Sequence, residues 1–404
     1  MNQNNNIPKL RFPEFSDTWE NKKLGEIGNF IGGGTPSTKN ANFWNGDVPW
    51  ISSSDISDES IYKINKSRFI SREAISQTAT KLIPAKSILI VSRVGVGKVA
   101  INETEICTSQ DFTNLIVELD NYIFLAYLIK FKTNKLLEFN QGTSIKGFVK
   151  SDLENLEINI PSLPEQTKIA TFLTAVDEKL TQLKQKKELL SQYKNGIMQQ
   201  IFSQKLRFKD DNGNDFEDWE EKKLGEVSDV RDGTHDSQKY IEKGYPFITS
   251  KNLLKNGNID FENVSYISEK DYKKINERSK VNINDILFGM IGTIGNPVLV
   301  KNDGFAIKNV ALIKEKKGLL NIYLIHFLKG GSITQQFFEQ NTGGTQKFLS
   351  LSVVRSLLIN LPCLSEQTKI ANFLSALDEK ISNAENKITK LEQWKKGLLQ
   401  SMFC

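Results

Sequence analysis

Apolar residues recur in steps of four and three along two stretches of the chain, residues 161–205 and 361–404. This spacing places the apolar side chains on one face of an α-helix, as in the seam of a coiled coil. Proline and glutamate stand near the start of each stretch, where a helix tolerates proline and its dipole favours an acidic side chain. The pattern therefore predicts two long helices.

We expect these helices to pair through their apolar seams in an antiparallel direction. A pseudo-two-fold axis would then place one of the remaining segments at each end. The alternative is that each helix covers the core of its own half. Lysines interrupt the seams at Lys187, Lys194 and Lys395. The residues predicted to pair are Ile169, Leu173, Val176, Leu180, Leu183, Leu190, Ile370, Leu374, Leu377, Ile381, Ile388 and Leu391. Four aromatic residues outside the seam either dock a partner or pack on the adjacent domain: Phe172, Tyr193, Phe373 and Trp394.

The segments before each helix mix short apolar runs of β type with apolar helical runs. WISSSDI, SILIVSRVG, TNLIVELD and YIFLAYLIKF in the first segment have counterparts YPFITS, DILFGMIG, VALIKE and IYLIHFLK in the second. Each segment predicts a domain of mixed helices and strands. The predicted fold class is α+β, with two α/β domains separated by two long antiparallel helices. The predicted divisions are a domain at 1–160, a helix at 161–205, a domain at 206–360 and a helix at 361–404.

The same order of elements reveals an internal repeat over nearly the whole chain. SLPEQTKIATFLTAVDEKL at 162–180 matches CLSEQTKIANFLSALDEKI at 363–381 in 13 of 19 positions. KLRF and KKLGE also occur twice, GTP matches GTH, and GTSIKGF matches GTQKFL. The repeat is too long for a solenoid, so it predicts one scaffold that presents two different surfaces. Met402 and Phe403 of the final SMFC match Ile201 and Phe202, which precede the second KLRF, and this predicts a cyclic, pseudo-two-fold object.

Composition narrows the class of protein. The chain has 404 residues, a formal net charge of +5 and three scattered cysteines. We expect a cytoplasmic protein without a disulfide framework, zinc site, signal peptide or membrane span. The charge permits nucleic-acid binding but does not decide it.

Catalytic patterns are missing from both copies of the repeat. The two histidines, His235 and His326, form no triad with serine and aspartate that recurs in both halves. GVGK at 95–98 has neither the spacing nor the Ser or Thr of a phosphate loop. We therefore predict no catalytic residue, no metal and no cofactor in this chain.

Short polar and basic loops do recur in both copies. Ser, Thr and Gly contact phosphate oxygens well, and Lys or Arg add charge or bind guanine. Any one of these residues taken alone is more readily an ordinary surface group than a DNA contact, so the signal lies in the recurrence. The DNA-binding candidates are Thr35, Ser52, Ser53, Arg93, Lys98, Ser144, Lys146, Thr234, Ser250, Lys251, Thr345 and Lys347.

At this point the sequence resembles the specificity subunits of type I restriction-modification systems. The resemblance is carried by LPEQTKIATFL and LSEQTKIANFL, each followed by DEK, with support from KLGE and from GTSIKGF and GTQKF. It implies a non-catalytic subunit whose two target-recognition domains each bind half of a split, asymmetric DNA target. The helices would act as a spacer and dock two methyltransferase subunits.

The resemblance also implies the remaining partners. Restriction subunits would join the complex, and S-adenosylmethionine, ATP and Mg would be bound by partner subunits. It does not identify base-contacting residues, the DNA sequence, the gap between half-sites or which domain binds which half. Two other hypotheses remain open: a tether that binds protein ligands along the rod, and an enzyme with an unrecognised site. Salt-insensitive binding would favour the first, and activity of the isolated chain would favour the second.

Overall fold

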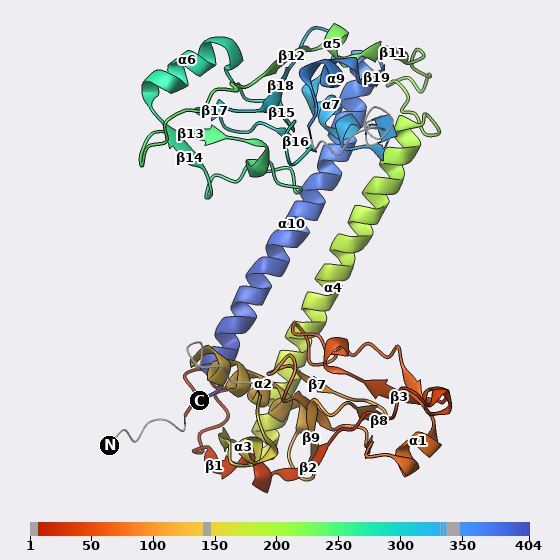
Figure 1. The fold of residues 1–404 in the computed structure, drawn as a ribbon, viewed down its shortest axis with the longest axis vertical. Helices are drawn as coiled ribbons and strands as arrows, with labels where there is room; N and C mark the ends of the chain where they lie inside the picture. The colour runs from red at the N-terminus through yellow and green to blue at the C-terminus, as the bar shows by residue number, and fades with distance from the viewer. Residues whose placement is uncertain (1–6, 140–146, 332, 334, 337–347) are drawn as a thin grey trace. The chain divides into compact units, whose positions relative to one another are not determined.

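A computed structural model describes residues 7–139, 147–331, 333, 335–336 and 348–404 (Figure 1). The chain divides into unit 1, residues 1–185 with 385–404, and unit 2, residues 186–384. Helices α4 (Leu163–Phe202) and α10 (Leu364–Met402) each begin in one unit and end in the other. Each unit therefore contains the first part of one long helix and the last part of the other.

Unit 1 is built on two four-stranded sheets and a two-stranded ribbon. The first sheet is antiparallel and has the order β2 (Gly28–Gly32), β9 (Phe112–Val117), β6 (Ile88–Val91) and β7 (Val99–Ile101). The second has the order β4 (Phe69–Ile70), β3 (Val48–Ile51), β8 (Ile106–Thr108) and β5 (Leu82–Ile83), with β3 and β8 parallel. The ribbon pairs β1 (Glu20–Lys23) with β10 (Glu157–Ile160).

Unit 2 repeats this plan, without a counterpart of β5 among its described residues. Its antiparallel sheet has the order β12 (Asp229–Asp232), β18 (Val310–Lys314), β15 (Ile286–Gly289) and β16 (Gly295–Leu299). Its second sheet has the order β14 (Ser265–Ile267), β13 (Tyr245–Ile248) and β17 (Ala306–Ile307), and β13 is again parallel to the strand that follows it in the sheet. The ribbon pairs β11 (Glu220–Lys223) with β19 (Leu358–Leu361).

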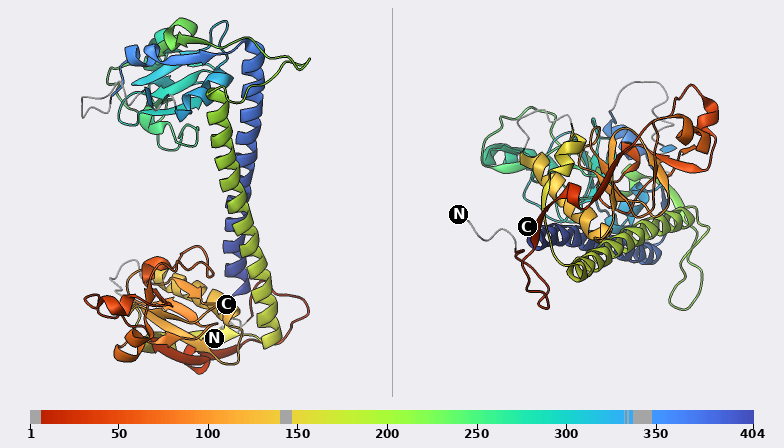
Figure 2. Two further views of the ribbon diagram at one scale, coloured as in Figure 1. Left: turned by 90° about the vertical axis from the view of Figure 1, so that its right-hand side faces the viewer. Right: turned by 90° about the horizontal axis from the view of Figure 1, so that it is seen from below.

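Short helices complete both units (Figures 1 and 2). Unit 1 has α1 (Arg72–Gln77), α2 (Tyr122–Phe139) and α3 (Lys150–Glu154), with 3₁₀ turns η1 (Leu24–Glu26), η2 (Ala41–Trp44) and η3 (Ser53–Asp55). Unit 2 has α5 (Leu224–Val227), α6 (Glu269–Ser279), α7 (Asn321–Leu328), α9 (Leu351–Ser356) and the 3₁₀ turn η4 (Ser250–Asn252). No helix among the described residues combines the length and the apolar character needed to cross a bilayer.

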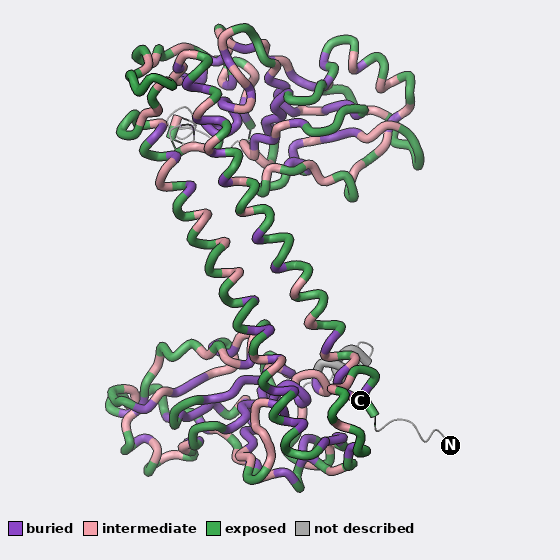
Figure 3. Tube along the Cα trace, turned by 180° about the vertical axis from the view of Figure 1, so that it is seen from behind, coloured by how far each residue is buried: buried purple, intermediate pink, exposed green. Residues whose placement is uncertain are grey.

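The long helices contribute to the core of each unit, as the buried segments in Figure 3 show. In unit 1, Ile169 and Leu173 of α4 join the same buried cluster as Leu398 and Met402 of α10. In unit 2, Ile370 and Leu374 of α10 join a cluster with Met198 and Ile201 of α4. Each long helix therefore both covers the core of a unit and packs on the other helix. The predicted α+β fold with two α/β domains and two paired long helices is confirmed.

The predicted pairing residues differ in how deeply they are buried. Eight are buried: Ile169, Leu173, Val176, Leu180, Ile370, Leu374, Leu377 and Ile388. Leu183, Leu190, Ile381 and Leu391 are half-buried. In unit 1 the two helices run antiparallel, because Asp177 pairs with Lys395 and the later Lys184 of α4 pairs with the earlier Glu392 of α10. In unit 2 Lys194 of α4 pairs with Asp378 of α10.

The repeated EQ dipeptide ties each long helix to its unit. Buried Glu165 accepts two 2.7 Å hydrogen bonds from Arg11 of the first KLRF. Buried Glu366 accepts bonds from Arg207 of the second KLRF, at 2.9 and 3.3 Å, and from the Trp219 indole at 2.8 Å. A buried carboxylate without a partner would lower the stability of the fold. Each EQ dipeptide therefore occurs with the arginine of a KLRF motif.

The glutamine of the same dipeptide satisfies backbone groups at the start of the helix. Gln166 donates to the Pro161 carbonyl and accepts from the Asn121 amide. Gln367 donates to the Pro362 carbonyl and accepts from the Leu320 amide. The repeated EQ dipeptides therefore hold each unit on its long helix. We call the contacts of Glu165 and Gln166, and of Glu366 and Gln367, the frame.

Candidate nucleic-acid interface

Backbone hydrogen bonds define which surface positions are equivalent in the two units. The amide of Ser109 donates to Ile51, at the end of β3, and the amide of Lys308 donates to Ile248, at the end of β13. Three segments lie around these strand ends in each unit: a 3₁₀ turn (η3 or η4), a glycine-containing turn (93–98 or 291–296) and the loop that follows β2 or β12 (33–35 or 233–235). We call the exposed side chains of these three segments the recognition surface. Loops on a rigid sheet are the usual place for binding residues.

The 3₁₀ turn uses its first residue as a cap. The Ser52 amide and hydroxyl both donate to the Asp55 carboxylate at 2.8 Å. The Thr249 amide and hydroxyl both donate to Asn252 at 2.9 Å. The candidate Ser52 is therefore engaged in holding the turn, and Ser54 and Lys251 occupy the exposed position two residues later.

An ion pair holds this turn in unit 1, whereas unit 2 has the neutral Asn252 in the place of Asp55. Arg68 pairs with Asp55, donates to Ser52 and lies 4.6 Å over the Trp50 ring. Burial alone would raise the pKa of Asp55, but the hydrogen bonds from Ser52 and the Arg68 guanidinium outweigh it and lower that pKa. The equivalent Asn252 instead donates to the carbonyls of Asp260 and Asn263.

The glycine-containing turn presents different side chains in the two units. The backbone amide of Phe148 donates to Ser92, and the backbone amide of Leu349 donates to Met290, so Arg93 and Ile291 hold equivalent positions. Both are exposed, and Arg93 makes no hydrogen bond or ion pair to another described residue. Here unit 1 offers a guanidinium where unit 2 offers an apolar side chain.

Two further candidates of these turns have structural partners. Lys98 donates to the carbonyls of Ser53 and Ile56, at 3.4 and 3.2 Å. In unit 2, the Asn296 side chain makes the matching tie to the Leu253 carbonyl. Ser250 is buried and bonds the Asn309 carbonyl and the Met290 amide, at 3.1 and 3.2 Å.

The GT motif of the third segment approaches the parallel strand closely. A Cβ on Gly33 would lie 2.0 Å from the Ser109 carbonyl oxygen, and one on Gly233 would lie 2.4 Å from that of Ile307. Only glycine fits such contacts. The amides of Gly34 and Thr234 donate to the equivalent residues Thr108 and Ile307.

This register places Thr35 at the position of His235 and not at that of Thr234. The Thr35 hydroxyl bonds the Gln110 side chain, and His235 Nδ1 bonds the Asn309 side chain at 2.7 Å. Gln110 and Asn309 occupy equivalent positions after the parallel strand. Each unit therefore presents a side-chain amide braced by a neighbouring loop, and amide groups can bond base edges.

His235 is held at both ring nitrogens. Nε2 lies 2.8 Å from the Asp232 carboxylate, which also pairs with Arg278, and Nδ1 faces the Asn309 oxygen. These two hydrogen bonds, with Asp232 the larger contributor, raise the pKa of His235 above its ordinary value. The arrangement favours the imidazolium form, because both acceptors then receive a proton.

Three of the DNA-binding candidates are exposed, namely Thr35, Arg93 and Lys251. Ser52, Ser53, Lys98 and Thr234 are half-buried, and Ser250 is buried. Ser144, Lys146, Thr345 and Lys347 lie outside the described residues. The flanking residues Phe148 and Leu349 contact the glycine-containing turn in both units.

Arg68, Gln110 and Asn309 are not among the residues predicted from the sequence, and His235 was considered there only as a catalytic candidate. Gln110 and Asn309 could have been found by aligning the residues that follow the parallel strands. Arg68 had no such signal, since it lies outside the repeat landmarks and reaches its turn through space.

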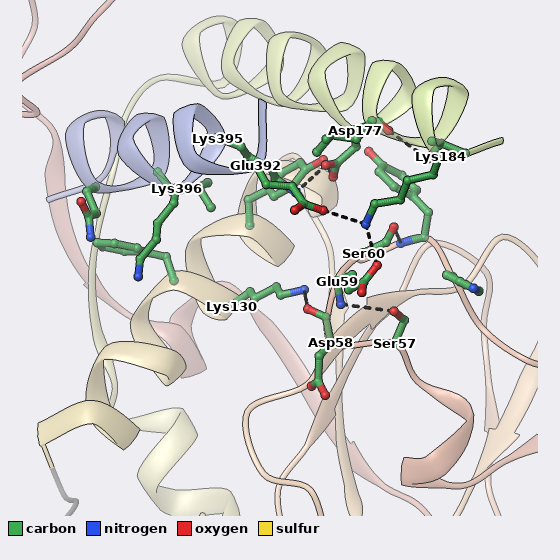
Figure 4. Close-up of a pocket in the computed structure, with 18 of the residues that line it drawn as sticks. Ser57, Asp58, Glu59, Ser60, Lys130, Asp177, Lys184, Glu392, Lys395 and Lys396 are labelled. Atoms are coloured by element: carbon green, nitrogen blue, oxygen red, sulfur yellow. Dashed lines mark hydrogen bonds and ion pairs between the residues drawn. The ribbon is translucent and has the colours of Figure 1, made fainter. Parts of the chain in front are cut away.

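A cavity of about 1120 Å³ lies in unit 1 and is lined by the loop at residues 57–63 and by side chains of α2, α4 and α10 (Figure 4). Lys184 spans it with ion pairs to Glu59 at 2.7 Å and to Glu392 at 2.8 Å. Asp58 at its rim lies 3.7 Å from Lys98. The cavity thus borders the recognition surface. Across the part of the chain that the structure describes, no cluster of His, Cys, Asp or Glu suits a metal ion.

Residues 16–192 and 216–393 match the family model described as "Type I restriction modification DNA specificity domain". The MjaIX type I restriction enzyme specificity subunit of Methanocaldococcus jannaschii is 29% identical, over 95% of this chain and 92% of that relative. The MjaVIII specificity subunit of the same organism is 24% identical, over 98% and 93%.

Solved structures share the fold. The crystal structure of a type I restriction-modification S subunit from M. genitalium superposes with a TM-score of 0.64 at 17% identity, covering 98% of this chain and 99% of that one. A chain from a study of complex assembly and conformational transition of the type I R-M system gives 0.58 at 18% identity, covering 95% and 96%.

Proposed function

Because the chain belongs to the family of type I restriction modification DNA specificity proteins, we propose that its two recognition surfaces bind the two halves of a split, asymmetric DNA target. In this role the chain is the non-catalytic specificity subunit of the restriction enzyme, with unit 1 and unit 2 each supplying one target-recognition domain. We assign the first domain to residues 1–160 and the second to residues 206–360.

One observation supports an asymmetric target, in which the two half-sites differ. Equivalent backbone positions hold Arg93 in unit 1 and Ile291 in unit 2. A guanidinium donates to guanine, whereas an aliphatic side chain suits the methyl group of thymine. Two such surfaces favour different half-sites. Binding both halves through one chain also raises affinity by effective concentration, even if each surface alone binds weakly.

The helices and partners complete the proposal. The pairing of α4 with α10 sets the gap between half-sites, and the helices dock two methyltransferase subunits, with restriction subunits joining the assembly. S-adenosylmethionine, ATP and Mg belong to those partners in this scheme. Trp394 and Tyr193 are exposed on the helices and are candidates for docking.

The test is to co-express the chain with its methyltransferase subunit and to map methylated adenines in the host genome. We expect one split motif. Replacing residues 206–360 by the equivalent segment of another specificity subunit should change one half of the motif and leave the other half and the gap unchanged. A motif that stays the same after this exchange would contradict the proposal. Binding should also weaken steeply with salt, as phosphate contacts require.

A further inference from the structure

A charged pair joins the two long helices inside unit 1. Asp177 of α4 pairs with Lys395 of α10 and accepts a 2.7 Å hydrogen bond from Tyr127 of α2 (Figure 4). The Lys395 ammonium lies 5.5 Å from the centre of the Tyr127 ring. The side chains of Asp177 and Lys395 are only 7% and 13% exposed, so the pair is largely withdrawn from water.

The equivalent pair joins the helices inside unit 2 with the charges exchanged between them. Lys194 of α4 lies 2.5 Å from Asp378 of α10, with 10% and 44% of the two side chains exposed. His326 of α7 stands near it, with Nδ1 3.7 Å from Asp378. Burial and the neighbouring Lys194 lower the pKa of His326 to about 3, so the ring is neutral and Lys194 balances the carboxylate.

The positions of the four charges favour one alignment of the helices. Asp177 and Lys194 are separated by the same interval on α4 as Asp378 and Lys395 on α10, so both pairs form together in the antiparallel register. A parallel alignment of the two repeats would place Asp177 against Asp378. It would also place Lys194 against Lys395.

Shifted antiparallel registers are disfavoured as well. A slide of one heptad would bring Asp177 against Met402 in one direction and against Ile388 in the other. Both of these residues are buried. Lys395 would face Lys184 in the first case and Ala170 in the second. Each shift therefore leaves a charge in an apolar or repulsive site, which is costly.

Stability alone does not account for these pairs. Lys194 and Lys395 occupy the apolar face that the heptad pattern defines, where replacing an ion pair by apolar side chains is often neutral or stabilising. The best-attested use of a buried polar group in a coiled coil is to specify register. We propose that Asp177–Lys395 and Lys194–Asp378 are register keys, positioning residues that hold α4 and α10 in one alignment and thereby fix the gap between the DNA half-sites.

This inference rests on the proposed function, and its test uses the full chain with its methyltransferase subunit. The first variant removes the keys without leaving a charge unpaired: Asp177→Leu, Lys395→Leu, Lys194→Leu and Asp378→Leu, with Tyr127→Phe to remove the orphaned hydroxyl. We expect a melting temperature within about 4 °C of the wild type or above it. The mapped motif should keep both half-sites but appear with more than one gap.

A matched control removes an exposed ion pair between the same helices. Lys184 and Glu392 are 38% and 47% exposed, so Lys184→Leu with Glu392→Leu should leave a single, unchanged gap. A single wild-type gap in the first variant would overturn the inference and leave the proposed function standing. A wild-type complex without a split motif would overturn the proposed function itself.

A reciprocal exchange tests the same idea in a chain that keeps its charges. Lys194→Asp alone sets two carboxylates against each other, and we expect the variant to lose most of its methylation. Adding Asp378→Lys should restore methylation with the wild-type gap, since the charges again match only in the original register. Failure of the second substitution to restore activity would contradict the assignment of this pair.

Discussion

Units 1 and 2 share a frame and differ at the surface that the frame supports. Glu165 with Arg11 and Glu366 with Arg207 make the same buried contact in the two units. On the recognition surface the equivalent positions diverge, as Thr35 and His235 illustrate. The two units keep the same residues at the buried contacts that hold the fold, and they differ in the residues that face solvent on the recognition surface.

The difference also separates two kinds of polar residue on the surface. Some polar side chains close the turns in both units, such as Ser52 and its counterpart Thr249. Others, such as Arg93, are exposed and make no hydrogen bond or ion pair to another described residue. Only the second kind is free to bond DNA without first breaking a bond within the protein.

The frame contacts should give the largest effects. Glu366→Ala removes the acceptor of Arg207 and of the Trp219 indole in a fully buried site. We expect a loss of about 2–3 kcal/mol in the unfolding free energy, because the half-buried Arg207 guanidinium and the Trp219 indole lose their buried acceptor. Arg207 keeps its bonds to the Phe216 and Glu217 carbonyls, which limits the loss. Urea unfolding followed by tryptophan fluorescence measures it. Glu165→Ala should cost a similar amount, since Arg11 bonds it at two oxygens.

A surface pair provides the control for these variants. Lys150 and Glu154 form an exposed ion pair in α3, and Glu154→Ala should cost less than about 0.5 kcal/mol. A cost of Glu366→Ala no larger than that of Glu154→Ala would show that the repeated EQ dipeptide has another role than holding the frame.

Arg93 and Ile291 should show the next largest effect, on specificity. Arg93→Ala should relax the preference for one base pair in one half-site by about 1–3 kcal/mol, a change of about fivefold to 150-fold. Ile291→Ala should affect the other half-site only. Binding to duplexes altered one base pair at a time measures both. Equal loss on all sequences would mean that Arg93 contacts phosphate and does not bind a base.

Much of the fold was predictable because periodicity and repetition are visible in the sequence. The heptad spacing predicted both long helices, and the doubled landmarks predicted two similar units. The recognition surface was less predictable, since its residues depend on contacts distant in sequence. Arg68 reaches Ser52 from the residue just before β4, and the buried Ser250 bonds the backbone of Met290 and Asn309. The match of GTP with GTH is off by one residue, because the strand contacts and not the letters decide the register.

Ser250 and Ser53 provide a third test of the comparison. Ser250→Ala would leave the amide of Met290 and the carbonyl of Asn309 without their side-chain partner in a buried site. We expect unit 2 to lose about 1–2 kcal/mol of unfolding free energy. Ser53 is half-buried at the equivalent position, and Ser53→Ala should cost less than about 0.5 kcal/mol in unit 1. Equal costs would show that the two turns are built alike.

The smallest expected effect is a pH dependence confined to unit 2. Asp232 and Asn309 raise the pKa of His235, so the ring keeps its positive charge to a higher pH than an ordinary histidine. Its interaction with Asp232 is fully present below the ordinary pKa of about 6.5 and is lost as pH rises through the raised value. Nearby DNA phosphates should lose a favourable charge over the same range.

We therefore expect the affinity for the mapped duplex to fall by up to about fivefold between pH 6 and pH 8.5 at constant ionic strength, as the loss of one exposed charge allows. His235→Gln should remove this dependence while the affinity at high pH stays near that of the wild type. Unit 1 has Thr35 at the equivalent position, so Thr35→Ala should leave the pH dependence of binding as it is in the wild type. A pH dependence that persists in His235→Gln would place the titrating group elsewhere.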